Sequence, residues 1–451
     1  FLLDKLEVYD DLVRLLLDSN EPEAALHASE RSRGRNFLDL LGTDRVTLAS
    51  AQDQADVRRA HDLRADAEML QRELARAKTQ EERAALNQRL DAARLAHQQH
   101  LLDLRARSPQ VASMVTVDVA TAPELQALLE PGTALVVYHA LDDEIAIFVL
   151  GTETFASARV PVSRDELARA IAALRADMQT FDVIGPSRDD LSRWLMDPIE
   201  PLLPAGTTVI GIAPHRELHR APFAALRLGG ADIIERAALF QVPSASVLRH
   251  TLARRRDTTA VPRVMALGNP DLSLPMAQKE AERIAWQFPG ATIHTGAAAT
   301  DARLVADASD YSILHIASHG EFDPAAPLLS GLQLAPSQGS DGNLTAQDVF
   351  GLKLDADLVA LSACQTGLGR LSNGDDVIGL NMAFLYAGAR QVLSTLWRVD
   401  DVSTAILVKH FYRNDSEASR AEALRRAQLE VRERYPHPAH WAGMYLVGDW
   451  E

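Results

Sequence analysis

Apolar residues at the start of the chain recur at the spacing of an α-helix. Leu12 and Leu16 belong to one apolar stripe, the polar segment 20–23 interrupts it, and small alanines continue the pattern on a second helix. Small residues at helix contacts are typical of helical repeats, which need neighbours to bury their faces. Residues 1–50 are therefore expected to end a repeat array. The chain begins with Phe1 rather than Met, as a fragment would. Because such repeats need neighbours, we expect further repeats upstream in a longer protein.

Residues 52–107 carry the most regular helical pattern, with leucines and alanines at every third or fourth position. The pattern is interrupted at 78–82, where Thr79 and Glu82 have the spacing of a capping box that starts a new helix. We therefore predict a long antiparallel helical hairpin over residues 51–109. Such a hairpin is either a structural spacer or a lever that passes a signal from the repeats to the rest of the chain.

From about residue 115 onward, short apolar runs alternate with helical patterns. The predicted strands are 134–141, 145–150, 207–213, 263–268, 313–317, 358–361 and 391–396, and the predicted helices are 163–180, 188–203, 277–288 and 376–387. This alternation predicts an α/β fold in which helices cover both faces of a largely parallel sheet. Ligands of such sheets bind beyond the carboxyl ends of the strands.

Composition narrows the possible functions. The chain has 46 lysines and arginines against 62 aspartates and glutamates, a net charge of −16, so we expect no direct contact with nucleic acid. No apolar run approaches the length of a membrane span, and no membrane association is expected. The single cysteine, Cys364, cannot form an internal disulfide, which fits a reducing cytoplasm.

Two reactive side chains stand in similar positions. Cys364 follows the apolar run 358–361, and His319 follows the apolar run 313–317, with glycine close behind each. A thiolate nucleophile and a histidine that takes and returns its proton are the parts that cysteine-based catalysis needs. The backbone N–H groups of Gly320 and Cys364 are candidates for binding the oxyanion of a tetrahedral intermediate.

These residues also have interpretations that involve no catalysis. Cys364 alone could be a buried inert thiol, because free cysteine packs well in cores. His315 and His319 could suggest a metal pair, but their spacing does not converge in an extended strand, so we expect no metal. No phosphate-binding GxxxxGK[ST] loop is present, and no cofactor is expected. His215 and His219 lie in a proline-bounded loop and are interpreted as structural or surface residues.

Four segments together resemble a known family. They are 315–320 (His-Ile-Ala-Ser-His-Gly), 361–367 (Leu-Ser-Ala-Cys-Gln-Thr-Gly), 396–401 (Leu-Trp-Arg-Val-Asp-Asp) and 441–449 (Trp-Ala-Gly-Met-Tyr-Leu-Val-Gly-Asp), supported upstream by 214–226, 243–246 and 266–271. They are similar to the CHAT family, caspase- and separase-related cysteine peptidases of clan CD that often follow tetratricopeptide repeats in bacteria. The resemblance runs from about residue 110 to 451.

The resemblance implies a caspase-like fold with His319 and Cys364 as a catalytic dyad. It also implies an inactive, pseudo-caspase-like half over 110–255 beside an active half over 256–451, and it identifies 1–50 as the end of tetratricopeptide repeats. The function expected from it is a regulated endopeptidase in bacterial defence or signalling. Its substrate would be a protein, and a regulatory partner would act through the N-terminal helices.

A specificity for basic residues is expected from the segment after the strand at 391–396. Separases have a similar Leu-Trp segment whose aspartate receives an arginine before the scissile bond, and Asp401 matches that aspartate, with Asp400 beside it. The resemblance therefore implies cleavage after arginine, or after lysine. Asp401 could instead cap a helix that starts at Val402. Asp375 is a second acidic candidate, which could equally be a helix cap.

Two other functions stay open on the sequence alone. The α/β unit could be a catalytically silent scaffold that binds a partner through the repeats, because a fold does not determine a function. It could also be a cysteine-dependent acyl transferase, since transfer to an amine uses the same dyad and oxyanion donors as hydrolysis.

Overall fold

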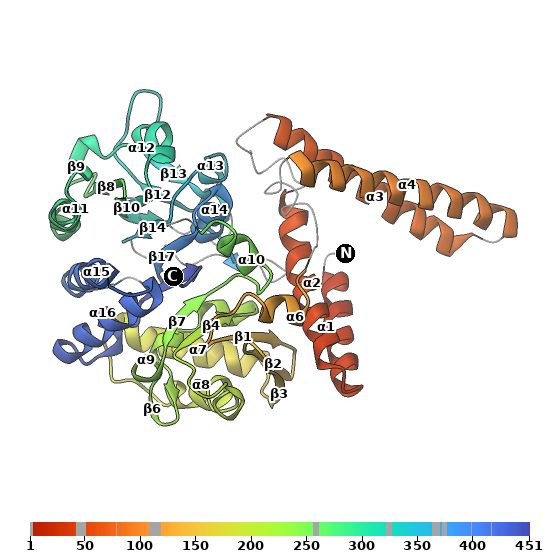
Figure 1. Cartoon of the computed structure of the whole chain (residues 1–451), viewed down its shortest axis with the longest axis horizontal. Helices are drawn as coiled ribbons and strands as arrows, with labels where there is room; N and C mark the ends of the chain where they lie inside the picture. The colour runs from red at the N-terminus through yellow and green to blue at the C-terminus, as the bar shows by residue number, and fades with distance from the viewer. Residues whose placement is uncertain are drawn as a thin grey trace.

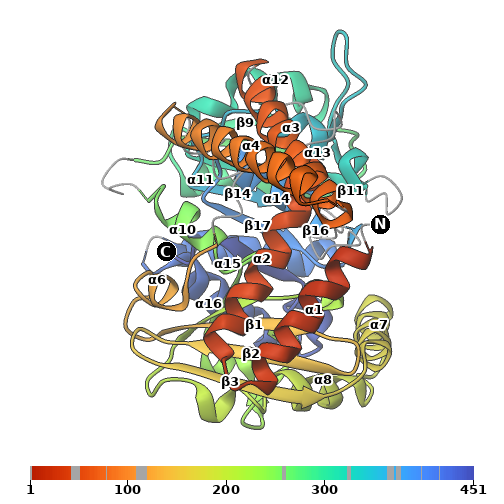
Figure 2. The ribbon, with the colours of Figure 1, turned by 90° about the vertical axis from the view of Figure 1, so that its right-hand side faces the viewer.

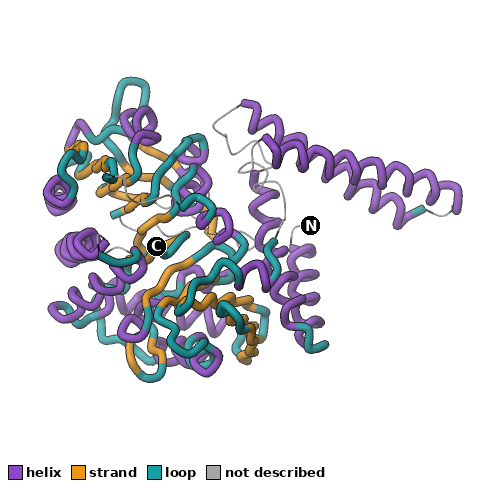
Figure 3. The backbone as a smooth tube through the Cα atoms, viewed as in Figure 1, coloured by secondary structure: helices purple, strands orange, loops and turns teal. Residues whose placement is uncertain are grey.

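The computed structural model of the protein describes residues 3–41, 51–77, 79–107, 119–255, 261–321, 327–362, 370–371, 377–397, 399–415 and 417–451. Figure 1 shows an α/β body built on one large sheet, with four N-terminal helices beside it. In Figure 3 the strands lie in the body, and the first four helices lie outside it.

The N-terminal region is helical, as its pattern predicts. The helices are α1 (Leu3–Asp18), α2 (Pro22–Leu41), α3 (Ala51–Arg76) and α4 (Gln80–Arg107). Helices α3 and α4 pair as the predicted hairpin and project away from the body (Figure 1). The capping box at the start of α4 is present, because Glu82 N donates to Thr79 Oγ1 and Thr79 N donates to Glu82 Oε2, both at 3.2 Å. Within the described residues, no helix is long and apolar enough to cross a membrane.

The body is organised around an 11-stranded sheet. In order across it lie β3 (Phe155–Pro161), β2 (Glu144–Leu150), β1 (Thr133–Ala140), β4 (Val209–Ala213), β7 (Ala238–Gln241), β18 (Met444–Gly448), β17 (Gln391–Thr395), β14 (Leu358–Leu361), β10 (Ile313–Ala317), β8 (Val264–Gly268) and β9 (Thr292–Thr295). Most neighbouring strands are parallel, which confirms the predicted α/β class.

Apart from β2 and β3, which pair antiparallel beside β1, the sheet consists of two parallel groups that run in opposite directions. Strands β1, β4, β7 and β18 are parallel to one another, and so are β17, β14, β10, β8 and β9. Strand β18 is antiparallel to β17 and so joins the two groups. The carboxyl ends of the first group therefore lie at the opposite edge of the sheet from those of the second.

Helices cover both faces of the sheet. Helices α11 (Pro275–Gln287) and α15 (Asp401–Asp415) pack on one face of the second group, while α12 (Asp301–Asp307), α13 (Ala346–Phe350) and α14 (Leu380–Ala387) pack on the other (Figure 1). Helix α16 (Arg420–Arg434) packs beside α15 and contacts β7 and β18 of the first group. Side chains of β10 alternate between the two cores: Ile313 joins the first and Leu314 the second. The remaining helices are α6 (Ala122–Gln126), α7 (Arg164–Thr180), α8 (Ser187–Leu195), α9 (Ile233–Arg236) and α10 (Val247–Leu252).

Small β elements lie outside the main sheet. Strands β11 (His319–Glu321), β12 (Gly331–Gln333) and β13 (Asn343–Thr345) form a three-stranded antiparallel sheet. Two short hairpins are made by β5 (Arg227–Leu228) with β6 (Ala231–Asp232) and by β15 (Arg370–Leu371) with β16 (Val377–Ile378). Strand β11 begins two residues after β10 ends, so the chain leaves the main sheet at His319.

A buried carboxylate holds the joining strand in place. Asp449 follows β18 with its side chain fully buried, and it accepts hydrogen bonds from Arg255 Nε (2.9 Å) and Nη2 (2.7 Å) and from Arg390 Nη2 (2.8 Å). Burial opposes ionisation, but the two arginines hold the pKa of Asp449 below its ordinary value. Gly448 precedes it with φ of +111°, and a Cβ there would lie 2.3 Å from Arg390 O, so only glycine fits.

We expect Asp449→Asn to destabilise the protein by about 3 kcal/mol, because it leaves two arginines in and around the core without their shared carboxylate. Urea denaturation followed by circular dichroism measures the loss. The matched control is Asp142→Asn, which removes an exposed partner of Arg164 and is expected to cost below about 1 kcal/mol. Equal effects of the two substitutions would contradict this role for Asp449.

Candidate active site

The strands that lead to the predicted dyad are neighbours in register. Strand β10 pairs with β14 in parallel, and Ile316 lies opposite Leu361. His319 is the third residue after Ile316, and Cys364 is the third residue after Leu361. Cys364 itself, like Asp375, lies outside the described residues. The pairing of Cys364 with His319 therefore stays a prediction, which the register of the two strands favours.

His319 is held by a loop that the sequence did not single out as part of the site. Its side chain is 40% exposed, and its Nε2 lies 2.6 Å from Ser273 Oγ and 3.7 Å from Asp271 Oδ2. Ser273 Oγ lies 2.8 and 2.9 Å from the two carboxylate oxygens of Asp271. If the hydroxyl donates to the carboxylate, the imidazole donates from Nε2 to the hydroxyl. Nδ1 is then the nitrogen that accepts a proton.

Asp271 is suited to orient the histidine as a carboxylate. Burial raises its pKa, but hydrogen bonds from the backbone and side chain of Ser273, together with the charge of His319, bring the pKa below the ordinary value. An ionised Asp271 can stabilise an imidazolium at His319, which is the role of the aspartate in a serine-protease triad.

The loop that carries Asp271 and Ser273 has an unusual backbone. Asn269 and Leu272 both have left-handed φ angles, +50° and +64°. Asn269 N donates to Ala317 O at 2.9 Å, and Asn269 Oδ1 accepts from Leu274 N at 2.7 Å, so the loop is tied to the end of β10 and to the start of α11. Strain that is held in place by such contacts is common at functional sites. A sequence signal was available: Asp271 and Ser273 have the spacing of an Asx-turn after an apolar strand.

The capping role considered for Asp401 falls to the preceding residue. Asp400 Oδ1 accepts from Ser403 N at 2.8 Å, and Asp400 O accepts from Thr404 N at 3.0 Å. Helix α15 begins at Asp401, whose exposed side chain is not the cap. Asp400, predicted as a substrate-binding residue, thus has a structural role that fixes the start of α15.

Asp401 lies where the starts of α11 and α15 and the His319 loop converge. Its pKa is raised by partial burial and by the negative charges of Glu280 and Asp400, although the backbone N–H of Met276 and the charge of His319 act to lower the pKa. Asp401 is therefore close enough to His319 for their charges to interact. An aspartate crowded by like charges favours a cation beside it.

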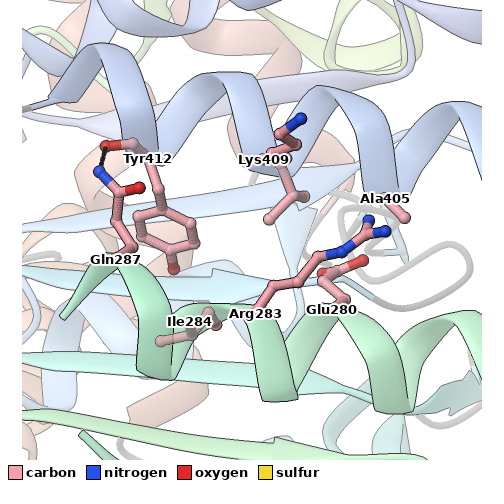
Figure 4. Close-up of a pocket in the computed structure, with 8 residues that line it drawn as sticks. Glu280, Arg283, Ile284, Gln287, Ala405, Lys409 and Tyr412 are labelled. Carbon is pink, nitrogen blue, oxygen red and sulfur yellow. Dashed lines mark hydrogen bonds between the residues drawn. The ribbon is translucent and has the colours of Figure 1, made fainter. Parts of the chain in front are cut away.

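Glu280 connects this acidic edge to the core. It is 5% exposed, and its Oε1 lies 2.9 Å from Nε2 of the fully buried His315, whose Nδ1 is 3.1 Å from Tyr412 Oη. Figure 4 shows the small pocket between α11 and α15 that Glu280 lines together with Arg283, Lys409 and Tyr412. His315 faces this helix layer while His319 lies at the sheet edge. Among the described residues no group of three or more His, Cys, Asp or Glu side chains could hold a metal.

The C-terminal segment supports the strand end that precedes Asp401. Leu396 N donates to Gly443 O at 2.9 Å, and Trp397 Nε1 donates to Ala439 O at 3.3 Å. A Cβ on Gly443 would lie 2.8 Å from a methyl carbon of Val399. The glycine in segment 441–449 therefore permits the close approach of this segment to Trp397 and Val399.

A family model described as CHAT domain matches residues 186–449, more than half of the chain. The chain belongs to the CHAT-domain family. Tetratricopeptide repeat protein 28 of Mus musculus is 27% identical over 294 residues, and that of Homo sapiens is 28% identical over 292 residues. Each match covers 51% of this chain and only 12% of the relative, so the chain spans a small part of their length.

The fold of this chain is also found in a solved structure. The crystal structure of the Saccharomyces cerevisiae separase–securin complex at 2.6 Å matches with a TM-score of 0.53 and 10% sequence identity, covering 94% of this chain and 40% of that chain. At this identity the match shows the fold alone. The predicted caspase- and separase-like architecture is confirmed, with a large, mostly parallel sheet and N-terminal helices.

We expect Ser273→Ala and Asp271→Asn each to slow alkylation of Cys364 by iodoacetamide about tenfold at neutral pH, because His319 is then less well oriented as the base. The rate is measured by mass spectrometry of the intact protein, in which Cys364 is the single thiol. Asp310→Asn is the matched control, since this exposed aspartate precedes β10 at its other end. Unchanged rates in both loop variants would contradict the proposed orientation.

Proposed function

We propose that this CHAT domain is a cysteine endopeptidase that cleaves a protein partner after arginine or lysine. The observation that carries the proposal is the set of contacts around His319. A strained loop presents Asp271 and Ser273 to one nitrogen of the imidazole, and the strand leading to Cys364 runs beside β10 in register. The match to the CHAT family supports the same chemistry.

In the proposed reaction His319 takes the proton of the Cys364 thiol at Nδ1. The thiolate attacks the carbonyl carbon of the scissile peptide, and the oxyanion that forms accepts hydrogen bonds from backbone N–H groups, for which Gly320 and Cys364 are the candidates. The C–N bond then breaks as the imidazolium gives its proton to the leaving amine. Water hydrolyses the thioester with His319 again as the base, which returns the free thiol.

The proposed specificity rests on the charge around Asp401. Because Asp400 caps helix α15, the carboxylate of Asp401 is not used as a cap and stays exposed. It lies close enough to His319 and Glu280 for their charges to interact. A guanidinium beside it would relieve the repulsion among these carboxylates through charge-assisted hydrogen bonds. The resemblance of segment 396–401 to that of separases favours the same assignment, and the pathway we propose, bacterial defence or signalling, rests on that family resemblance.

The proposal is tested by incubating the full chain with a library of fluorogenic peptides and with candidate partner proteins. We expect cleavage by the wild type, and loss of at least about a thousandfold in kcat/KM for Cys364→Ala and His319→Ala. Fragments that appear equally with all three proteins would refute the peptidase. Products joined to an added amine in place of hydrolysis would show an acyl transferase, and binding without cleavage by any variant would show a scaffold.

Asp401→Asn is expected to raise KM for arginine substrates about tenfold or more, with kcat less affected, because a charge-assisted contact to the substrate is lost. Asp400→Asn provides a closely matched control. Asparagine is as good a helix cap as aspartate, so this variant keeps the start of α15 and is expected to keep KM within about twofold. A preference for aspartate or an apolar residue before the scissile bond would refute the role of Asp401.

The pH dependence of KM follows from the raised pKa of Asp401. An ionised Asp401 binds the guanidinium, and protonation abolishes the attraction. Because burial, Glu280 and Asp400 raise its pKa, KM for arginine substrates should increase on acidification at a higher pH than an ordinary aspartate would give. The increase should be absent in Asp401→Asn, as steady-state kinetics over a range of about pH 4 to 8 would measure.

A further inference from the structure

The N-terminal helices are attached to the body through buried charged groups. Arg33 of α2 is 1% exposed and donates to the backbone oxygens of Pro214, at 2.6 Å, and of Tyr138. Glu30 is fully buried and accepts from Ser246 N at 2.8 Å. Such groups are costly to bury unless every contact is kept, so α2 has one defined position on the body. Figure 2 shows α1 and α2 crossing in front of β1 and β2.

Helix α1 reaches the same place through Asp10. Its Oδ1 lies 3.0 Å from His139 Nε2, and its Oδ2 accepts from Arg216 Nη2 at 2.7 Å. His139 stacks on His215 with ring centroids 4.0 Å apart, and His215 Nδ1 accepts from Ala140 N at 2.9 Å. The predicted structural role of His215 agrees with this buried position. Asp10 therefore connects α1 to the loop after β4, which continues as the short helix η2 (Arg216–Arg220).

The short helix η2 packs on α7, and α7 reaches the opposite edge of the sheet. Near the start of α7, Arg164 Nη2 donates to Glu217 Oε1 at 2.8 Å. Further along the same helix, Arg175 Nη2 donates to the backbone oxygen of Leu396 at 2.8 Å. Leu396 follows β17 and opens the segment 396–401 that contains Asp401.

The guanidinium of Arg175 is buried beside a second cation, Arg220. Burial and the nearby charge of Arg220 lower its pKa to about 10. Arg175 Nη1 and Arg220 Nε are buried without a hydrogen-bond partner in the part of the chain that the structure describes. The repulsion between the two buried guanidinium groups depends on the distance between Arg175 and Arg220. A shift of η2 that moved Arg220 would therefore change the hold of Arg175 on Leu396.

We propose that Arg175 is a positioning residue through which the docking of α1 and α2 sets the place of Asp401. Three contacts connect the two sites: Asp10 binds Arg216, η2 packs on α7, and Arg175 donates to Leu396. A partner that moves the repeat helices would act on substrate binding by this route. The inference rests on the proposed function for its effect on specificity, but the coupling itself is a property of the fold.

Kinetics of the full chain on arginine peptides test the positioning role. Arg175→Gln is expected to raise KM about fivefold or more while kcat changes less, and Arg175→Lys, which keeps a donor, is expected to recover most of the loss. Asp10→Asn should act in the same direction, and its effect should not add to that of Arg175→Gln. Asp18→Asn is the matched control, because Asp18 also lies on α1 and accepts from an arginine, Arg159, at 2.6 Å.

Hydrogen exchange of the amides in 396–402 tests the coupling without any need for activity. We expect faster exchange in Arg175→Gln and in Asp10→Asn, and wild-type exchange in Asp18→Asn. Unchanged exchange in Asp10→Asn, or effects of Asp10 and Arg175 that simply add, would overturn the proposal even if the peptidase is active. If wild type cleaves nothing but exchange responds as expected, the proposed function fails and the coupling stands. Should Asp10→Asn detach α1, seen as fast exchange throughout that helix, Arg216→Lys replaces it.

Discussion

The antiparallel pairing of β18 with β17 is the constraint on which the architecture depends. It joins two parallel groups of strands that run in opposite directions, and Asp449 with Arg255 and Arg390 locks the strand in place. Because of this junction, the loops after β1 and β4 lie at one edge of the sheet and the His319 loop at the other. The N-terminal helices dock at the first edge, and α7 spans the sheet to the second.

The candidate site is built from a loop that follows a strand and from the starts of two helices, which the sheet brings together. The loop after β8 orients His319, the start of α11 gives a backbone N–H to Asp401, and Asp400 fixes the start of α15. Asp271 is held ionised beside the histidine, whereas Asp401 is crowded by like charges. Two aspartates at one sheet edge thus differ in pKa because their neighbours differ.

Much of the fold could be predicted from the sequence, because the long apolar runs and helical stripes determine their own local structure. The hairpin of α3 and α4 and the strands around 313–317 and 358–361 are examples. Strands β7 and β18 were missed, because a short strand is recognisable only through its neighbours in the sheet. His319 could be found from its place after an apolar strand. Asp271 and Ser273 were missed: their spacing indicates a turn, but their role depends on a contact between two loops that are distant in sequence.

Covalent labelling by a peptidyl acyloxymethyl ketone that ends in arginine tests the dyad and the specificity together, with the adduct located by mass spectrometry. We predict a single adduct on Cys364, formed much faster than with the same reagent ending in leucine. We also predict that His319→Ala nearly abolishes labelling and that Asp401→Asn removes the preference for arginine. Equal rates for the two reagents, or labelling that does not depend on His319, would contradict the proposed site.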